Sequence, residues 1–189
     1  MKIAVTGAYD SRKKGVYSSL FLYLNVYKGI PKEHMRSIDV IKTLQEQGLE
    51  FGDKTTFLKQ EGIFNFQETR EVLAEIDMSD KKFEHLLLNK TIFDVYVYTE
   101  FKFPDEAKRF LYGELRKWIP RHPYNFLVKV PVFENGLQNN DNQQKMDQRL
   151  EEILKEMEVS FLKLEKNFFQ QNTKEHSRIF EEYFGKQLK

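Results

Sequence analysis

The chain has 189 residues, of which 40% are hydrophobic and 31% charged, and its formal net charge is +1. This length suits one globular domain with a real core, and 17 Phe with 9 Tyr predict that much of the core is aromatic. The balanced charge gives no argument for a nucleic-acid partner or an anionic membrane. The absence of cysteine excludes disulfides and thiolate metal sites.

No apolar run approaches the ~20 residues of a membrane span, and no apolar segment of a signal peptide follows Lys2. The four histidines are scattered, without the spacing of metal ligands. We therefore expect a cytoplasmic protein with no membrane partner, no nucleic-acid partner and no metal site.

The elements are predicted from hydrophobic periodicity and from start and stop signals. In chain order they are a strand at 2–6, a helix at 13–27, a strand at 33–37, a helix at 38–47, a helix at 55–76 and a strand at 85–90. Residues 92–98 fit a helix or a strand, because β-branched and aromatic residues mix there. A helix at 104–118, a strand at 124–132, a helix at 145–158, a strand at 159–165 and a helix at 173–184 complete the chain.

Strands that alternate with helices predict an α/β fold, with a mostly parallel five-stranded sheet between two helical layers. Ligands of such sheets bind beyond the carboxyl ends of the strands. The segment Gly7–Gly15, GAYDSRKKG, would lie there, directly after the first strand.

This segment matches part of the phosphate-binding pattern G-x-x-x-x-G-K-S/T. Gly7 and Lys13 are in register, whereas Arg12 stands at the second glycine and Lys14 at the hydroxyl residue. Lys14 cannot ligate Mg²⁺ and would repel it, so Mg²⁺ binding is not expected. We expect an anion site formed by Gly7, Ser11, Arg12, Lys13, Lys14 and Gly15; the alternative is a solvated turn with a basic run.

Three further stretches follow in order: QEGIFNFQETRE at 60–71, LLLNKTIFDVYVYTE at 86–100 and YNFLVKVPVFENGLQ at 124–138. Together with GAYDSRKKG they resemble the P-loop nucleoside and nicotinamide-riboside kinase family. The resemblance extends to about Lys166 and implies a P-loop domain at 1–166, with a helical extension at 167–189. It also implies acceptor-substrate contacts from Gln60, Gln67, Lys90 and Asp94; for the two glutamines, a solvated polar face is the alternative.

The departures from this family fall on one mechanism. Besides Arg12 and Lys14, the family's acidic residue corresponds to Asn89 and its loop arginine to Gln138. Phosphoryl transfer depends on positioning and on neutralising charge, so these changes together predict impaired or absent transfer. Other residues remain candidates for the two missing groups. Asp39, Asp94 or Glu100 would supply the carboxylate, and Arg109, Arg116 or Arg121 would supply the cation.

Two functions are therefore weighed against a structural protein without ligand. The first is a kinase-like protein that binds ATP, another nucleotide, a nucleoside or another phosphorylated ligand with transfer lost, in a sensing or interaction role. The second is an active ATP-dependent nucleoside, nucleoside monophosphate or nicotinamide riboside kinase, in which Lys13 and Asp94 act in catalysis. The final helix is expected to pack on its own domain; a homodimer or protein-partner contact is the alternative.

Overall fold

The computed structural model describes residues 1–8, 12–49, 55–132 and 141–185. Its centre is a five-stranded sheet in the order β2-β3-β1-β4-β5, with every neighbouring pair parallel. The strands are β1 (Lys2–Gly7), β2 (Met35–Ile38), β3 (His85–Leu88), β4 (Phe126–Val130) and β5 (Leu162–Lys163). The predicted α/β fold with a parallel five-stranded sheet is confirmed.

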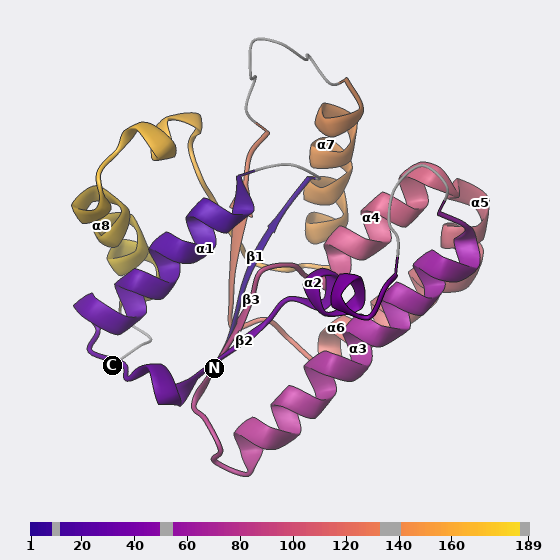
Figure 1. Ribbon diagram of the computed structural model, residues 1–189. Coiled ribbons are helices and arrows are strands. Elements are labelled where there is room, and N and C mark those ends of the chain that lie inside the picture. Colours follow the sequence, from indigo (N-terminus) through magenta and orange to yellow (C-terminus); the bar gives the residue numbers. More distant parts are fainter. Residues whose placement is uncertain (9–11, 50–54, 133–140, 186–189) are drawn as a thin grey trace.

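Helices cover both faces of this sheet (Figure 1). The α-helices are α1 (Lys13–Leu22), α2 (Val40–Glu46), α3 (Phe57–Ser79), α4 (Ile92–Lys102), α5 (Pro104–Glu106), α6 (Tyr112–Arg121), α7 (Asp141–Glu156) and α8 (Thr173–Phe184). The shorter helical segments are η1 (Tyr23–Tyr27), η2 (Lys32–His34), η3 (Ala107–Leu111) and η4 (Lys166–Gln170). Among them η1 and η3 are π-helical and continue their neighbouring α-helices.

The central strand β1 is buried along its whole length, as expected of a strand covered on both faces. Ile3 and Val5 belong to the hydrophobic core under α1 and α8, whereas Ala4 belongs to the core under α3, α4, α6 and α7. No helix among the described residues is long and apolar enough to cross a membrane.

The last helix packs on its own domain, as expected. Phe180 and Phe184 of α8 are fully buried in the core that also contains Val16 and Leu20 of α1. Phe168 of η4 joins the same core, so the segment after β5 covers one face of the sheet. A dimer or partner contact through this helix stays a prediction.

Three predicted elements differ in detail from the structure. Residues 92–98, which fitted two alternatives, lie in α4, and β5 is shorter than the strand predicted at 159–165. Helix α6 continues through Pro120, although the sequence predicted an end near Trp118. Pro120 removes the hydrogen bond to the carbonyl of Arg116, and this residue is exposed, so water can replace the lost donor.

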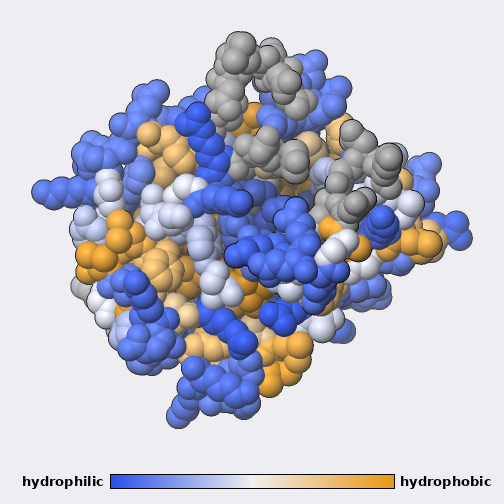
Figure 2. Space-filling model, in the orientation of Figure 1, coloured by the Kyte–Doolittle hydropathy of each residue, from blue (hydrophilic) through white to orange (hydrophobic). Residues whose placement is uncertain are grey.

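The surface in the orientation of Figure 1 is mainly hydrophilic and is interrupted by separate hydrophobic patches (Figure 2). The exposed large hydrophobic side chains lie on different helices: Leu22, Val26 and Tyr27 on α1 and η1, Leu58, Leu73 and Ile76 on α3, Phe101 on α4 and Phe110 on η3.

Candidate functional site

The candidate site lies at the carboxyl edge of the sheet, where β1, β2 and β3 end. Parallel pairing aligns these ends, since Ala4 pairs with Leu88 and Ile38 pairs with Leu88 from the other side. The residues that follow are Ala8 after β1, Asp39 after β2, and Asn89 with Lys90 after β3. Helix α1 begins at Lys13, after the segment 9–11 that contains Ser11, which is outside the described residues.

The Asp94 carboxylate accepts hydrogen bonds from β1, from α1 and from Thr91 before α4. One carboxylate oxygen accepts hydrogen bonds from the Gly7 amide at 3.0 Å and the Lys13 ammonium at 2.8 Å. The other accepts from the Thr6 hydroxyl at 3.1 Å, the Thr91 amide at 2.6 Å and the Thr91 hydroxyl at 2.8 Å. A carboxylate has about four lone-pair sites, so five donors leave Asp94 without free capacity. We interpret Asp94 as a positioning residue rather than a catalytic base.

A capping box explains why Asp94 lies there. Thr91 is the N-cap of α4, its hydroxyl accepts from the Asp94 amide, and the Asp94 side chain accepts from the Thr91 amide. The T-x-x-D spacing is visible in the sequence and is the signal that sequence reasoning missed. It would have identified residues 92–98 as the start of a helix.

Lys13 is fixed by the same cluster and is only 7% exposed. Its ammonium donates to the Gly7 carbonyl at 2.6 Å as well as to Asp94, so the start of α1 is tied to the end of β1. Lys14 is exposed, and its charge acts on Lys90. Lys13, the predicted phosphate-loop lysine, therefore lies at the sheet edge and pairs with the carboxylate of Asp94. Its expected phosphate contact stays a prediction.

Arg12 and Gly15 both lie against Phe169, and their expected phosphate contact stays a prediction. The Arg12 guanidinium lies 5.6 Å from the ring centre of Phe169, and a Cβ added to Gly15 would lie 3.0 Å from the same ring. Phe169 belongs to η4, so the segment after β5 packs against the first turn of α1. The glycine allows this approach, and the arginine stacks on the aromatic face.

Asn89 and Asp39 form a pair across β2 and β3. The Asn89 amide donates to one Asp39 oxygen at 3.2 Å, and the other Asp39 oxygen caps α2 by accepting from the Lys42 amide. An aspartate at position 89 would put two carboxylates in contact, which is costly at a partly buried site. A carboxylate, that of Asp39, is thus present at this edge beside Asn89.

Lys90 is partly buried and has no hydrogen bond or ion pair from its ammonium to any residue that the structure describes. Burial, with a smaller effect of the nearby Lys13, lowers its pKa to about 8 against the opposing charges of Asp94 and Asp39. With Lys13 and Asp94 it lines a small pocket of about 50 Å³, to which Tyr98, Met146 and Leu150 also contribute.

Gln60 and Gln67 are buried, at 3% and 1% exposure, so the alternative of a solvated polar face is wrong. Gln67 donates to Glu71 at 2.5 Å and to the Lys90 carbonyl at 3.4 Å, whereas Gln60 accepts from Thr99. Their expected substrate contact stays a prediction.

The other candidate substitutes lie elsewhere. Glu100 accepts from Arg149 of α7 and from Tyr96, and Arg109 stacks on Phe110. Arg116 and Arg121 are exposed on α6, and Gln138 is outside the described residues. Asp39 and Asp94 lie at the sheet edge, and Glu100 does not. Asp94 accepts from five donors, whereas each Asp39 oxygen accepts one hydrogen bond from an amide.

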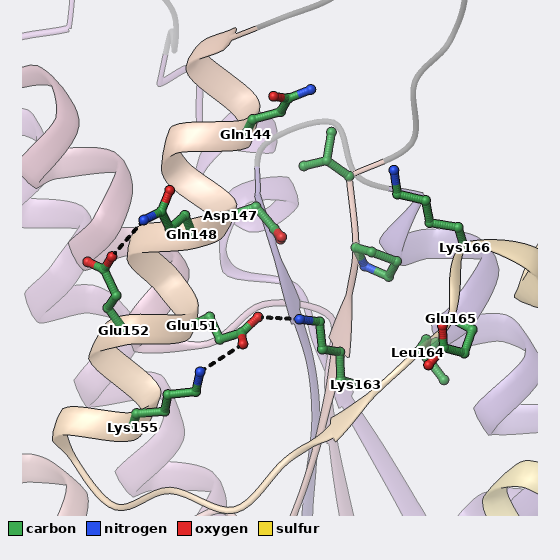
Figure 3. Close-up of a pocket in the computed structure, with 12 residues that line it drawn as sticks. Gln144, Asp147, Gln148, Glu151, Glu152, Lys155, Lys163, Leu164, Glu165 and Lys166 are labelled. Atoms are coloured by element: carbon green, nitrogen blue, oxygen red, sulfur yellow. Dashed lines mark hydrogen bonds and ion pairs between the residues drawn. The ribbon is translucent and has the colours of Figure 1, made fainter.

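A second, larger pocket of about 710 Å³ lies between α7 and the ends of β4 and β5 (Figure 3). Its walls are the α7 residues Gln144, Asp147, Gln148, Glu151, Glu152 and Lys155 and, opposite them, Pro131, Val132 and residues 163–166. Glu151 accepts from Lys163 and Lys155, and the fully buried Lys129 pairs with Asp147 at 2.8 Å. Pro131, which lines this pocket, follows Val130, and Val130 pairs with Gly7 at the end of β1. The larger pocket therefore lies next to the end of β1.

The donor set does not favour a metal ion. The described residues contain no group of three or more His, Asp or Glu side chains placed to hold one. At the sheet edge Asp94 is saturated by donors, and Lys14 occupies the place where the phosphate-loop pattern has a hydroxyl. The described residues at this edge therefore do not fit an Mg²⁺ ion.

Solved structures share this architecture. A NadR protein in complex with NAD and AMP-PNP superimposes with a TM-score of 0.69 at 13% identity, covering 97% of this chain and 50% of that chain. Deoxyadenosine kinase from M. mycoides, with dCMP and dCDP bound, gives 0.62 at 13% identity and covers 98% of this chain and 100% of that one. The chain has the fold of the P-loop nucleotide kinases.

The match to the NadR protein thus spans half of that protein's length, whereas the match to deoxyadenosine kinase is complete. The same kinase with dATP bound gives a TM-score of 0.53 at 10% identity. No family model matches the sequence, and no curated protein matches it. Identity this low shows the fold alone.

The first prediction concerns Asp94. Replacement Asp94→Asn leaves Lys13 as a buried cation without its carboxylate, so we expect the free energy of unfolding to fall by about 3–5 kcal/mol. Chemical denaturation measures it. Asp39→Asn is the control, because asparagine caps a helix as well as aspartate does, and its cost should stay below about 1 kcal/mol. Equal effects of the two changes would contradict the assigned role of Asp94.

Proposed function

We propose that this chain binds a nucleotide, or another ligand with a phosphoryl group, at the carboxyl edge of β1 and β3, and that it transfers phosphoryl groups weakly or not at all. The observation that carries the proposal is Lys90. Its ammonium is partly buried near Lys13 and Lys14 and lacks an anionic partner among the described residues. A desolvated cation beside two others is costly, and an anion bound among the three would remove that cost.

The surroundings support a phosphorylated ligand. Lys13 already lies at the start of α1, where backbone amides favour anions. The adjoining pocket of about 710 Å³ is within the range of small-molecule sites, although its lining is charged. The solved structures with this fold carry AMP-PNP, NAD and deoxynucleotides, which supports a ligand of the same class here.

Weak or absent transfer is inferred from the same residues. Lys14 stands where a hydroxyl would ligate the metal, and Asp94 is occupied by five donors. Phosphoryl transfer needs charge neutralisation that these groups do not supply. The ligand would then be sensed rather than converted.

Replacement Lys90→Met tests the binding site. We expect the variant to be more stable than the parent by about 1–2 kcal/mol, because an uncompensated cation leaves a partly buried position. We also expect its affinity for ATP to fall at least tenfold, since one of three cations is lost. Thermal shift measurements with and without ATP report both quantities, because a ligand stabilises the folded state by mass action.

The matched control is Lys117→Gln, at an exposed lysine of α6 that pairs with Glu114. It should change neither quantity by more than about 0.5 kcal/mol. If Lys90→Met weakens the fold and leaves ATP binding intact, the proposed anion site is wrong.

Asp39 favours a second candidate, an active ATP-dependent kinase for a nucleoside or nucleotide. Its carboxylate is half-buried at the sheet edge and is close enough to Lys90 to influence its charge. A carboxylate in that place could accept the proton of an acceptor hydroxyl. The expectation from the first proposal is no turnover above background with ATP, Mg²⁺ and a panel of nucleosides.

A coupled assay of ADP release measures that turnover. Activity of about 1 s⁻¹ or more, lost in Asp39→Asn and kept in Glu100→Gln, would establish the second candidate in place of the first. Glu100 is a suitable control, because its carboxylate pairs with Arg149 away from the sheet edge.

A further inference from the structure

Lys90 has the surroundings of a reactive amine as well as those of an anion ligand. Its side chain lines the pocket of about 50 Å³ together with Lys13, Asp94 and Tyr98. This space holds a few water molecules or one small anion and is much too small for a nucleotide. The amine has no partner among the described residues, so nothing in that part of the chain occupies its lone pair once it is neutral.

The charged groups that face Lys90 come from three elements. Lys13 and Lys14 of α1 disfavour its ammonium form, whereas Asp94 of α4 and Asp39 before α2 favour it, and α7 contributes the apolar Met146 and Leu150. Burial is the largest influence, and the result is a pKa of about 8. At pH 7.5 about a quarter of this amine is neutral, against about 0.1% of an ordinary lysine. Desolvation and neighbouring cations are the usual means of activating a lysine nucleophile.

We propose that Lys90 is an acylation site for small acyl phosphates, such as acetyl phosphate, which the lysine cluster would hold by their phosphate group. The proposal rests on the anion site proposed above. In the reaction the neutral amine attacks the acyl carbon, an amide C–N bond forms, and the C–O bond to phosphate breaks. Phosphate leaves with the electron pair of that bond, and the amine proton passes to solvent or to the leaving phosphate. No oxidant or reductant is needed.

The geometry favours this donor over neutral ones. Lys13 lines the same pocket as Lys90, and both Lys13 and Lys14 are close enough to act on its charge, so their positive charge favours the phosphate group. Holding the donor beside the nucleophile turns a bimolecular step into a local one. The product has lost the charge of Lys90, so acylation would switch off the anion site that guided it.

The test is a time course of acetylation of the full chain at pH 7.5 with acetyl phosphate, followed by peptide mass spectrometry. We expect Lys90 to react at least about tenfold faster than the exposed Lys117, because more of it is neutral, although a less basic amine is a weaker nucleophile. Millimolar inorganic phosphate should slow Lys90 and leave Lys117 unchanged. A parallel course with the neutral donor N-acetylimidazole should give a smaller ratio of the two rates.

The variant Lys14→Gln should reduce severalfold the preference of Lys90 for acetyl phosphate over N-acetylimidazole, because the loss of this charge weakens the attraction of the anionic donor and leaves the neutral donor without such a loss. Lys14 is exposed, so this change should not affect folding. Lys155→Gln should alter neither rate. Modification of Lys90 no faster than Lys117, or an equal ratio with both donors, would overturn the proposal. Fast, phosphate-sensitive modification without nucleotide binding would leave this inference standing and reject the proposed nucleotide ligand.

Discussion

The candidate site depends on the ion pair between Asp94 and Lys13. Asp94 begins α4, Lys13 begins α1, and the Gly7 amide and Thr6 hydroxyl at the end of β1 bind the same carboxylate. Three elements that are far apart in the sequence are therefore fixed by one side chain. Both partners are more than 90% buried, so their attraction is little screened by solvent, and neither charge would be tolerated there alone.

Two neighbouring lysines at this edge differ in their partners. Lys13 donates to Asp94 and to a carbonyl, whereas Lys90 nearby makes no ion pair or hydrogen bond through its ammonium with any of the described groups. At the ends of β2 and β3, the neutral side-chain amide of Asn89 donates a hydrogen bond to the Asp39 carboxylate, so this contact contains no ion pair. Among the described residues the edge thus keeps one cation without an ion pair, while Asp94 and Asp39 accept hydrogen bonds from other groups. That charge distribution suits an anion better than a metal ion.

Much of the fold could be predicted because burial acts on sequence patterns directly. The apolar runs of β1, β3 and β4 are covered on both faces, and the sequence shows them as nearly continuous hydrophobic segments. Residues 92–98 stayed undecided because periodicity alone could not separate a buried helix from a strand. The Thr91 capping box supplies the missing local information.

The site was predicted less completely, because its contacts join distant residues. Lys13 could be placed at the sheet edge, because Gly7–Gly15 directly follows the first strand. The stacking of Arg12 on Phe169 and the pairing of Asn89 with Asp39 could not, since they depend on how η4 and β2 pack. The buried state of Gln60 and Gln67 was also hidden, because polar residues at helical spacing usually face water.

We propose that this edge binds the phosphate groups of its ligand through positive charge and without a metal ion. Isothermal titration of the full chain with ATP, once in excess EDTA and once in millimolar Mg²⁺, tests it most directly. The account predicts measurable ATP binding in EDTA, with an affinity that Mg²⁺ changes by less than about threefold, a difference below 1 kcal/mol. Binding that appears only with Mg²⁺, or no binding at millimolar ATP, would contradict it.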